Sequence, residues 1–277
     1  MARVQFTKME GAGNDFLAVD GRSQPLAAAD YGRFAARYCR RRRGVGADGL
    51  LVLLEAREPG YDFAMRFFNP DGSEAEMCGN GARCIALFAH RLGAAGRRMR
   101  FQTVAGPVEA SITAGGVRLL MPPVPAPEER EVEAAGRRHL LYFTTCGVPH
   151  AVLPVEELET VDVAGLGAAI RYHPAFQPAG TNANFIEKAA GDTLRLRTYE
   201  RGVEAETLAC GTGACSAAAV AVGRLGLRPP VRVLTRGGDA LLIHLEEAED
   251  GSFPRVELEG PAVEVFRGEV EWPRQPR

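Results

Sequence analysis

An internal repeat constrains the fold of this 277-residue chain more than any other feature. The first copy reads GSEAEMCGNGA at residues 72–82, and the second reads GVEAETLACGTGA at residues 202–214. Each copy leads into an apolar stretch that closes with Arg-Leu-Gly, at 91–93 and at 224–226. Because such self-similarity indicates one structural unit built twice, we predict two halves of related fold.

The residues after each repeated cysteine are expected to form a helix. Residues 82–92 and 214–225 have helix length and many good helix formers, and Gly93 and Gly226 stand where left-handed C-terminal caps are typical. Each Cys-Gly-x-Gly segment then starts a helix, where unpaired N–H groups and the helix dipole favour negative charge. We expect a thiol there to have a lowered pKa and to act as a base, beside glycine N–H groups that can bind a carboxylate.

Short runs rich in β-branched and aromatic residues fill most of the remaining chain, so the sequence predicts an α+β fold. The proline-rich segment MPPVPAPEER breaks regular structure and is the expected linker. The predicted N-terminal lobe, residues 1–121 plus 267–277, carries Cys78. The predicted C-terminal lobe, residues 122–266, carries Cys210.

Composition excludes several classes of function. With 33 basic and 35 acidic residues the net charge is −2, so no strong field favours binding to nucleic acid or to a membrane surface. No segment has the ~20 apolar residues of a membrane span, and the N-terminus lacks a signal-peptide core, so we expect a cytoplasmic protein. The only lysines are Lys8 and Lys188, which leaves few candidates for the Schiff base of a pyridoxal-phosphate enzyme. We therefore expect no cofactor.

The cysteines are too few and too scattered for the disulfide framework of a small secreted domain. They are Cys39, Cys78, Cys84, Cys146, Cys210 and Cys215. Neither pair within the repeats has the short spacing common at zinc sites, so no metal is expected, and the four cysteines other than Cys78 and Cys210 are interpreted as core residues. The alternative interpretation of Cys78 and Cys210 is that both serve only tight packing. Packing alone, however, gives no reason to repeat a cysteine within two matching sequence segments.

Two thiols at helix starts can carry out two-base chemistry if they act on one carbon. A thiolate removes a proton from one face while a thiol delivers a proton to the other, and hydrogen bonds to a substrate carboxylate stabilise the carbanion. The repeat therefore indicates a racemase or epimerase that acts on a small amino acid.

A series of motifs, in order along the chain, resembles the diaminopimelate epimerase family. They are KMEGAGNDF from Lys8, FNPDGS from Phe68, MCGNGARC from Met77, GVPH from Gly147, TNANF from Thr181, YERG from Tyr199 and ACGTGAC from Ala209. The resemblance implies an enzyme that interconverts LL- and meso-2,6-diaminopimelate in lysine and peptidoglycan-precursor biosynthesis. It also implies two similar lobes, each a mixed sheet wrapped around a central helix, with the active site between them, and a homodimer.

The same resemblance assigns roles to individual residues. It implies that Cys78 and Cys210 are the catalytic acid and base, and that His150 and Glu200 assist proton transfer. The implied substrate-binding residues are Asn14, Asn69, Asn80, Asn182 and Arg201, together with Gly79, Gly81, Gly211 and Thr212 at the helix starts. Val148 departs from the pattern, since many family members have an asparagine there that contacts the substrate.

Three alternatives remain at this stage. A proline or hydroxyproline racemase shares the two-cysteine plan, although such enzymes resemble Met-Cys-Gly-His-Gly at the first motif, where this chain has Asn80. A redox sensor could use the two cysteines as a switchable disulfide. Individual residues also have simpler interpretations: Asn69 as a turn residue, Glu200 with Arg201 as an exposed charge pair, and the arginine run at 40–43 as a solvated helix end.

Overall fold

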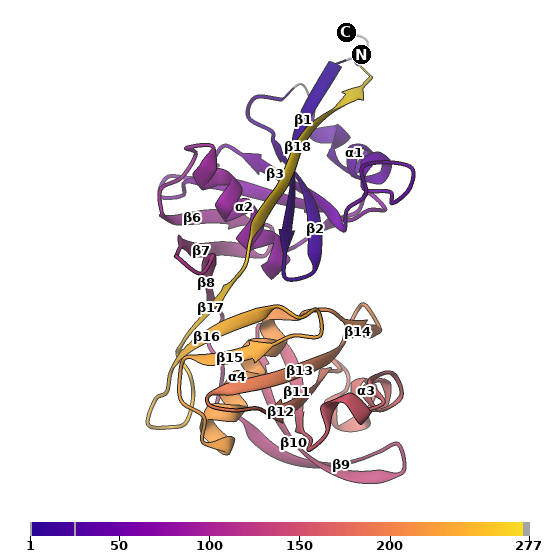
Figure 1. Ribbon diagram of the computed structural model, residues 1–277, viewed down its shortest axis with the longest axis vertical. Helices are drawn as coiled ribbons and strands as arrows, with labels where there is room; N and C mark the ends of the chain where they lie inside the picture. Colours follow the sequence, from indigo (N-terminus) through magenta and orange to yellow (C-terminus); the bar gives the residue numbers. More distant parts are fainter. Residues whose placement is uncertain (1, 25, 274–277) are drawn as a thin grey trace. The chain divides into compact units, whose positions relative to one another are not determined.

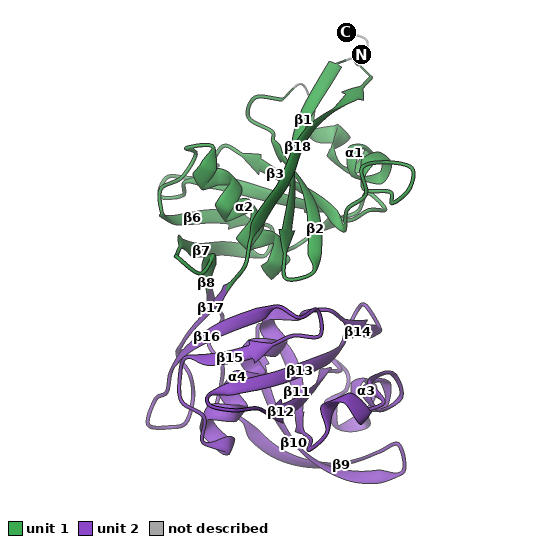
Figure 2. Ribbon diagram, viewed as in Figure 1, with its two compact units in different colours: residues 1–119, 260–277 green, residues 120–259 purple. Residues whose placement is uncertain are grey.

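The computed structural model describes residues 2–24 and 26–273, which form two compact units (Figure 2). The first unit comprises residues 1–119 and 260–277, and the second comprises residues 120–259. The chain thus returns to the first unit at residue 260. The sequence prediction had placed this return at residue 267. The reason is β18 (Val263–Trp272), which pairs antiparallel with β1 (Ala2–Gly11) along its whole length.

The first unit contains nine strands and two α-helices among the described residues. In chain order they are β1, β2 (Asn14–Asp20), η1 (Ala28–Asp30), α1 (Tyr31–Tyr38), β3 (Gly49–Leu54), β4 (Phe63–Phe68), β5 (Glu74–Ala75), α2 (Gly79–Arg91), β6 (Arg98–Thr103), β7 (Gly106–Ile112), β8 (Val117–Met121) and β18. Strands β18, β1 and β2 are antiparallel, β2 is parallel to β3, and β4 is antiparallel to β3 and β5 but parallel to β6. Strands β6, β7 and β8 continue antiparallel.

The second unit repeats this order of elements. It contains β9 (Glu128–Ala134), β10 (Arg137–Cys146), β11 (Val148–Pro154), η2 (Leu158–Thr160), α3 (Val163–Arg171), η3 (Pro174–Phe176), β12 (Asn182–Lys188), β13 (Thr193–Glu200), β14 (Ala205–Thr207), α4 (Gly211–Leu225), β15 (Val231–Leu234), β16 (Ala240–Glu246) and β17 (Arg255–Gly260) (Figure 1). Strands β9, β10 and β11 are antiparallel, β11 is parallel to β12, and β13 is antiparallel to β12 and β14 but parallel to β15. Strands β15, β16 and β17 are antiparallel.

The two pairing schemes correspond strand for strand, with β18 in the place that β9 takes in the second unit. This correspondence confirms the prediction of two pseudo-symmetric α+β lobes. In each unit one helix packs along the inner face of the mixed sheet: α2 contacts β1, β2, β3 and β7, and α4 contacts β10, β11, β12, β13, β15 and β16. Every residue of α4 from Gly213 to Ala221 is buried, because small side chains allow the sheet to approach closely.

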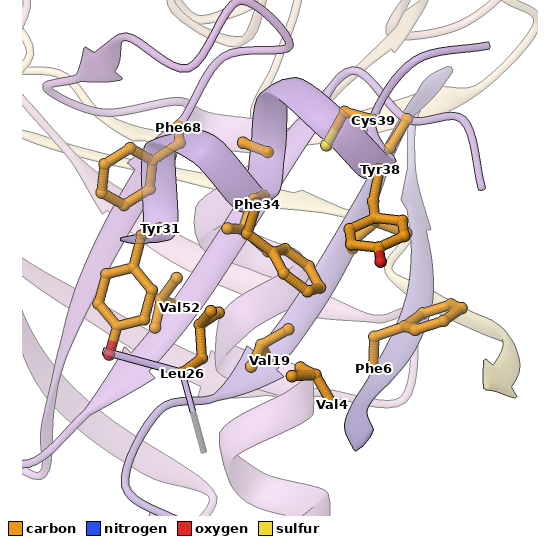
Figure 3. Close-up of a cluster of buried hydrophobic side chains, with 14 of the residues drawn as sticks. Val4, Phe6, Val19, Leu26, Tyr31, Phe34, Tyr38, Cys39, Val52 and Phe68 are labelled. Carbon is orange, nitrogen blue, oxygen red and sulfur yellow. The ribbon is translucent and has the colours of Figure 1, made fainter. Parts of the chain in front are cut away.

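A smaller helix covers the other face of each sheet. In the first unit Phe34 and Tyr38 of α1 point toward Val4 and Val19 in the cluster of Figure 3. The ring of Phe34 also lies 5.4 Å from that of Trp272 on β18. This contact explains why the C-terminal strand belongs to the first unit, since it closes the hydrophobic core there.

Both helices that follow the repeated cysteines are present, and each begins three residues earlier than predicted. Gly93 and Gly226 have φ of +70° and +71°, and Gly226 is the left-handed C-cap of α4, so both predicted caps are confirmed.

Candidate active site

Cys78 and Cys210 occupy the same position in the two units, the N-cap of α2 and of α4. Both have extended backbones, with φ, ψ of −139°, 122° at Cys78 and −121°, 110° at Cys210, and neither side chain caps its helix with a hydrogen bond. Each cysteine therefore stands directly before the first backbone N–H groups of its helix. None of the six cysteines forms a disulfide bond in the part of the chain that the structure describes.

In the first unit a chain of side-chain hydrogen bonds holds Asn80, two residues after Cys78. Its Nδ2 donates to Oδ1 of Asn14 at 2.8 Å, and its Oδ1 accepts from Nη2 of Arg83 at 2.9 Å. Asn14 in turn donates from Nδ2 to the carboxylate of Asp48 at 3.0 Å. Arg83 lies at one end of this series of hydrogen bonds and can only donate, whereas the Asp48 carboxylate at the other end can only accept. The orientation of both amides is therefore fixed.

The other predicted residues of the first unit are less closely connected. A Cβ atom added to Gly79 would meet nothing within 4 Å, so the first turn of α2 is open to a ligand there, whereas one added to Gly81 would lie 3.1 Å from Leu51. Asn69 lies in the turn after β4, where its Nδ2 donates to Oγ of Ser73 at 3.0 Å. The structure does not join Asn69 to Asn14 or Asn80 by a hydrogen bond, and the turn interpretation accounts for its observed contacts.

In the second unit the strand period of two brings polar residues to the face that packs against α4. Ala151, Ala183 and Tyr199 point to the opposite face, into the hydrophobic cluster that contains α3 residues. The residues that alternate with these three along the strands are polar. In the register of neighbouring strands, His150 lies opposite Asn182, and Asn184 lies opposite Thr198. Glu200 follows Thr198 by two residues and so lies on the same face.

His150 is fully buried, and its two ring nitrogens differ in environment. Nδ1 lies 3.1 Å from Nδ2 of Asn184, whereas Nε2 has no hydrogen-bond partner among the residues that the structure describes. Burial, reinforced by the positive charge of Arg201, lowers the pKa of His150 to about 3. The ring is therefore neutral at physiological pH.

Asn182 and Arg201 connect the ends of β11, β12 and β13. Asn182 donates from Nδ2 to the carbonyl of Pro149 at 3.0 Å, and its Oδ1 accepts from the backbone N–H of Arg201 at 2.8 Å. The guanidinium of Arg201 donates to the carbonyl of Ala179 at 2.9 Å. Glu200 and Arg201 do not form a surface ion pair with each other in the described contacts, so the charge-pair interpretation is not supported.

The expected lowering of the thiol pKa is wrong for Cys210. The pKa of this thiol is raised to about 12, chiefly by burial and also by the nearby charge of Glu200. The hydroxyl of Thr212, whose Oγ1 lies 3.6 Å from Sγ, and the N–H of Gly213 act in the opposite direction but do not compensate. Desolvation thus outweighs the helix start, and Cys210 is a neutral thiol in the ligand-free protein.

The pKa of Glu200 shifts in the same direction as that of Cys210. Burial raises the pKa of its carboxyl, and the Thr207 hydroxyl only partly opposes the shift. Burial thus favours the uncharged forms of both groups, and perturbed neighbouring groups of this kind are typical of functional sites.

The remaining cysteines are core residues, as predicted. Cys39, Cys84, Cys146 and Cys215 are each at most 1% exposed. Burial raises the pKa of Cys39 to about 12 and also raises the pKa of Cys84. No cluster of three or more His, Cys, Asp or Glu side chains is arranged to hold a metal ion within residues 2–24 and 26–273.

The sequence prediction missed three residues that hold the predicted ones: Asp48, Arg83 and Asn184. Arg83 follows Asn80 by one helical turn, and Asn184 follows Asn182 by two strand positions, so the helix and strand periods could have identified both. Asp48 lies far from Asn14 in sequence and had no such signal. Val148, the departure noted above, is partly buried at the start of β11.

Comparisons with known proteins identify the family of the chain. The sequence profile of the family described as "Diaminopimelate epimerase" matches residues 6–124 and 142–264. The diaminopimelate epimerase of Aquifex aeolicus (strain VF5) is 43% identical over 276 residues, which cover 96% of this chain and 98% of that protein. The chain belongs to the diaminopimelate epimerase family.

Solved structures extend the likeness of this diaminopimelate epimerase family member to more distant proteins. A phenazine biosynthesis protein of the PhzF family from Enterococcus faecalis matches 98% of this chain and 100% of its own, with a TM-score of 0.73 and 16% identity. A probable proline racemase from Agrobacterium radiobacter K84 matches 97% and 93%, with a TM-score of 0.68 and 16% identity. At such identities the likeness concerns the fold alone.

Membership of the diaminopimelate epimerase family confirms the resemblance seen in the motifs and makes the chain an enzyme of the isomerase class. No helix in the described ranges has both the length and the apolar character to cross a bilayer.

Proposed function

We propose that the protein interconverts LL- and meso-2,6-diaminopimelate without a cofactor, using Cys78 and Cys210 as its two proton-transferring groups. The observation that carries this proposal is the duplicated helix start, which places a thiol at the N-cap of α2 and of α4 with the same backbone conformation. A packing role would not need the same residue at both positions. Two equivalent thiols suit a reaction in which each side of a carbon exchanges a proton.

The helix starts also supply what the carbanion needs. Free N–H groups at a helix N-terminus bind carboxylates, and hydrogen bonds to the substrate carboxylate lower the cost of removing the α-proton. The open space at Gly79 allows the substrate to approach the backbone of α2. Asn80 and Asn14, whose amides are held in fixed orientations, each keep one N–H that can donate to the substrate.

One turnover needs one base and one acid, so one of the two cysteines reacts as the thiolate and the other as the thiol, and the reverse reaction exchanges these roles. Burial favours the neutral thiol at Cys210 in the ligand-free protein. Glu200, whose charge acts on this thiol, is our candidate for the group that assists its proton transfer.

The lysines support a route without pyridoxal phosphate. Lys8 is buried and paired with Asp15 at 2.6 Å between Nζ and Oδ2, and it also donates to the carbonyl of Gly46. Lys188 donates from an exposed position to the carbonyl of Leu225 at 3.3 Å. The first amine is held in an ion pair and the second is exposed, so neither has the desolvated, unpaired environment of a Schiff-base lysine.

The test is to incubate the purified, reduced protein with LL-diaminopimelate in deuterated water. We expect the meso isomer to form and to carry solvent deuterium at early times, while unconverted LL isomer stays protiated. Activity should survive prolonged chelation and hydroxylamine. Retention of the original hydrogen in the product would contradict the two-base mechanism, and racemisation of proline with no action on diaminopimelate would contradict the substrate.

The cytoplasmic location, inferred from the sequence, and the biosynthetic pathway and the homodimer, inferred from the family, stay predictions. Gel filtration with light scattering tests the last of them.

A further inference from the structure

The chain has five asparagines, of which four are predicted site residues. The fifth, Asn184, was not among the predicted site residues and is 1% exposed in the second unit. It contacts three elements around it: His150 on β11, Thr198 on β13 and Gly213 on α4. A buried amide must satisfy its donors and acceptors from such neighbours, so its orientation can be deduced.

The neighbours of Asn184 allow only one orientation of its amide. Nδ2 lies 3.1 Å from the carbonyl oxygen of Ala151, which can only accept a hydrogen bond. Oδ1 accepts from Oγ1 of Thr198 at 3.0 Å. Rotating the amide by half a turn would bring two oxygens together at Ala151, so Nδ2 must face that carbonyl.

This orientation determines the state of the His150 ring. The second N–H of the Asn184 amide points to Nδ1 of His150, 3.1 Å away, so Nδ1 must offer its lone pair. A neutral imidazole with an unprotonated Nδ1 carries its proton on Nε2. An imidazolium would instead set an N–H of the ring against an N–H of Asn184, so the same contact opposes protonation.

Two further residues hold Asn184 in place. Thr198 lies directly opposite it in the register of β12 and β13. Gly213 leaves the space that Oδ1 occupies, because a Cβ atom there would lie 2.5 Å from this oxygen. Contacts with β11, β13 and α4 therefore hold the Asn184 side chain in place.

We propose that Asn184 is a positioning residue that holds His150 as the neutral Nε2–H tautomer, and that His150 consequently acts as a hydrogen-bond donor and not as a base. The second clause rests on the proposed epimerase function. The observation that points to a ligand is Nε2, a buried donor with no partner in the described part of the chain. Such a group costs free energy until an acceptor arrives, and a substrate oxygen or a thiolate is such an acceptor.

The first test observes the His150 ring in the wild-type protein. Nitrogen-15 NMR distinguishes a protonated ring nitrogen from an unprotonated one, and the His150→Asn variant identifies the resonances by their loss. We expect the ligand-free protein at neutral pH to show a protonated Nε2 and an unprotonated Nδ1. A protonated Nδ1 would overturn the proposal whether or not the enzyme acts on diaminopimelate.

The second test uses Asn184→Asp, which keeps an oxygen for Thr198 but replaces the N–H donors by an acceptor. We expect the proton to move to Nδ1 of His150 and kcat to fall by about 10²-fold, with a smaller change in KM. Gln102→Glu is the matched control, since it makes the same change of amide to carboxylate on β6 of the first unit, where Gln102 accepts from the N–H of Arg57. It should leave the His150 spectrum unchanged.

Thr198→Val provides a second variant in case the buried carboxylate prevents folding. It removes the hydroxyl that orients Asn184, so we expect a mixture of tautomers and a smaller loss of kcat. An unchanged tautomer in both folded variants, or a changed tautomer with wild-type kcat, would contradict the positioning role. Absence of epimerisation by the wild-type enzyme would instead contradict the proposed function and leave the tautomer result standing.

Discussion

Nδ2 of Asn80 donates to Oδ1 of Asn14 across 2.8 Å, and this bond ties the cysteine motif of α2 to the start of β2. The amide of Asn80 also accepts from Arg83, so one buried side chain satisfies two polar neighbours. The geometry of the first helix start thus depends on residues that are distant in sequence. The contribution of Asn80 to the free energy of unfolding can be measured directly.

We predict that Asn80→Ala lowers the free energy of unfolding by about 1–3 kcal/mol, because it leaves the buried Arg83 and the half-buried Asn14 without this partner. Urea denaturation measures the change. Asn69→Ala is the control: its bond to Ser73 is exposed, so the expected change is within ~0.5 kcal/mol. If Asn69 binds substrate, as the resemblance implies, the same variant raises KM. Equal stability losses in the two variants would contradict the difference in burial.

A second prediction compares two glycines of α4. In Gly213→Ala the new Cβ would lie 2.5 Å from Oδ1 of Asn184 and 3.2 Å from Sγ of Cys210, so we expect a loss of about 1–3 kcal/mol in stability and a marked fall in kcat. Gly223→Ala meets nothing closer than 3.9 Å and should stabilise the helix by about 0.5–1 kcal/mol with normal activity. Thermal melts and steady-state assays check both. Normal stability and activity of Gly213→Ala would contradict the close contact between Gly213 and Oδ1 of Asn184.

A third prediction concerns stability at alkaline pH. The pKa of Cys39 is raised by burial to about 12, above its value near ~8.5 in an unfolded chain. Between these values the unfolded state loses the proton while the folded state keeps it. The contribution of Cys39 is therefore complete below pH ~8.5 and declines by about 1.4 kcal/mol per pH unit above it.

Urea denaturation between pH ~8.5 and ~10 measures this slope. Cys39→Ala should flatten it relative to wild type, in addition to a constant packing loss. Val52→Ala removes packing from the same cluster without removing a titrating group, so it should shift the curve and keep the slope. Parallel curves for wild type and Cys39→Ala would contradict the raised pKa.

A fourth prediction separates the two cysteines. Cys78→Ser and Cys210→Ser should each lower epimerisation by about 10²–10⁴-fold, because a hydroxyl is a much weaker base than a thiolate. Each variant should still remove a proton from the face served by its remaining cysteine, which a substrate analogue with a β leaving group reveals as elimination. The two variants should prefer opposite stereoisomers of the analogue. Matching preferences would refute the assignment of one cysteine to each face.

Several features of the fold were accessible from the sequence because they depend on local rules. The Cys-Gly-x-Gly segments, the helices after them and the glycine caps follow from propensity and backbone conformation, which neighbouring residues determine. The repeat identified two similar lobes before any coordinate was known. The sequence prediction placed the return of the chain to the first unit too late, because the return at 260 depends on the pairing of the first residues of β18 with β1, where Val263 lies opposite Glu10.

The sequence by itself determined which residues are brought to the helix starts and which family the chain belongs to, since motif identity and order are properties of the linear chain. Only the tertiary structure decided the protonation of Cys210 and the roles of Asn184, Arg83 and Asp48. A thiol pKa depends on how much water surrounds it, and burial overrode the local effect of the helix start. The orientation of a buried amide likewise depends on partners from other strands, which no local pattern specifies.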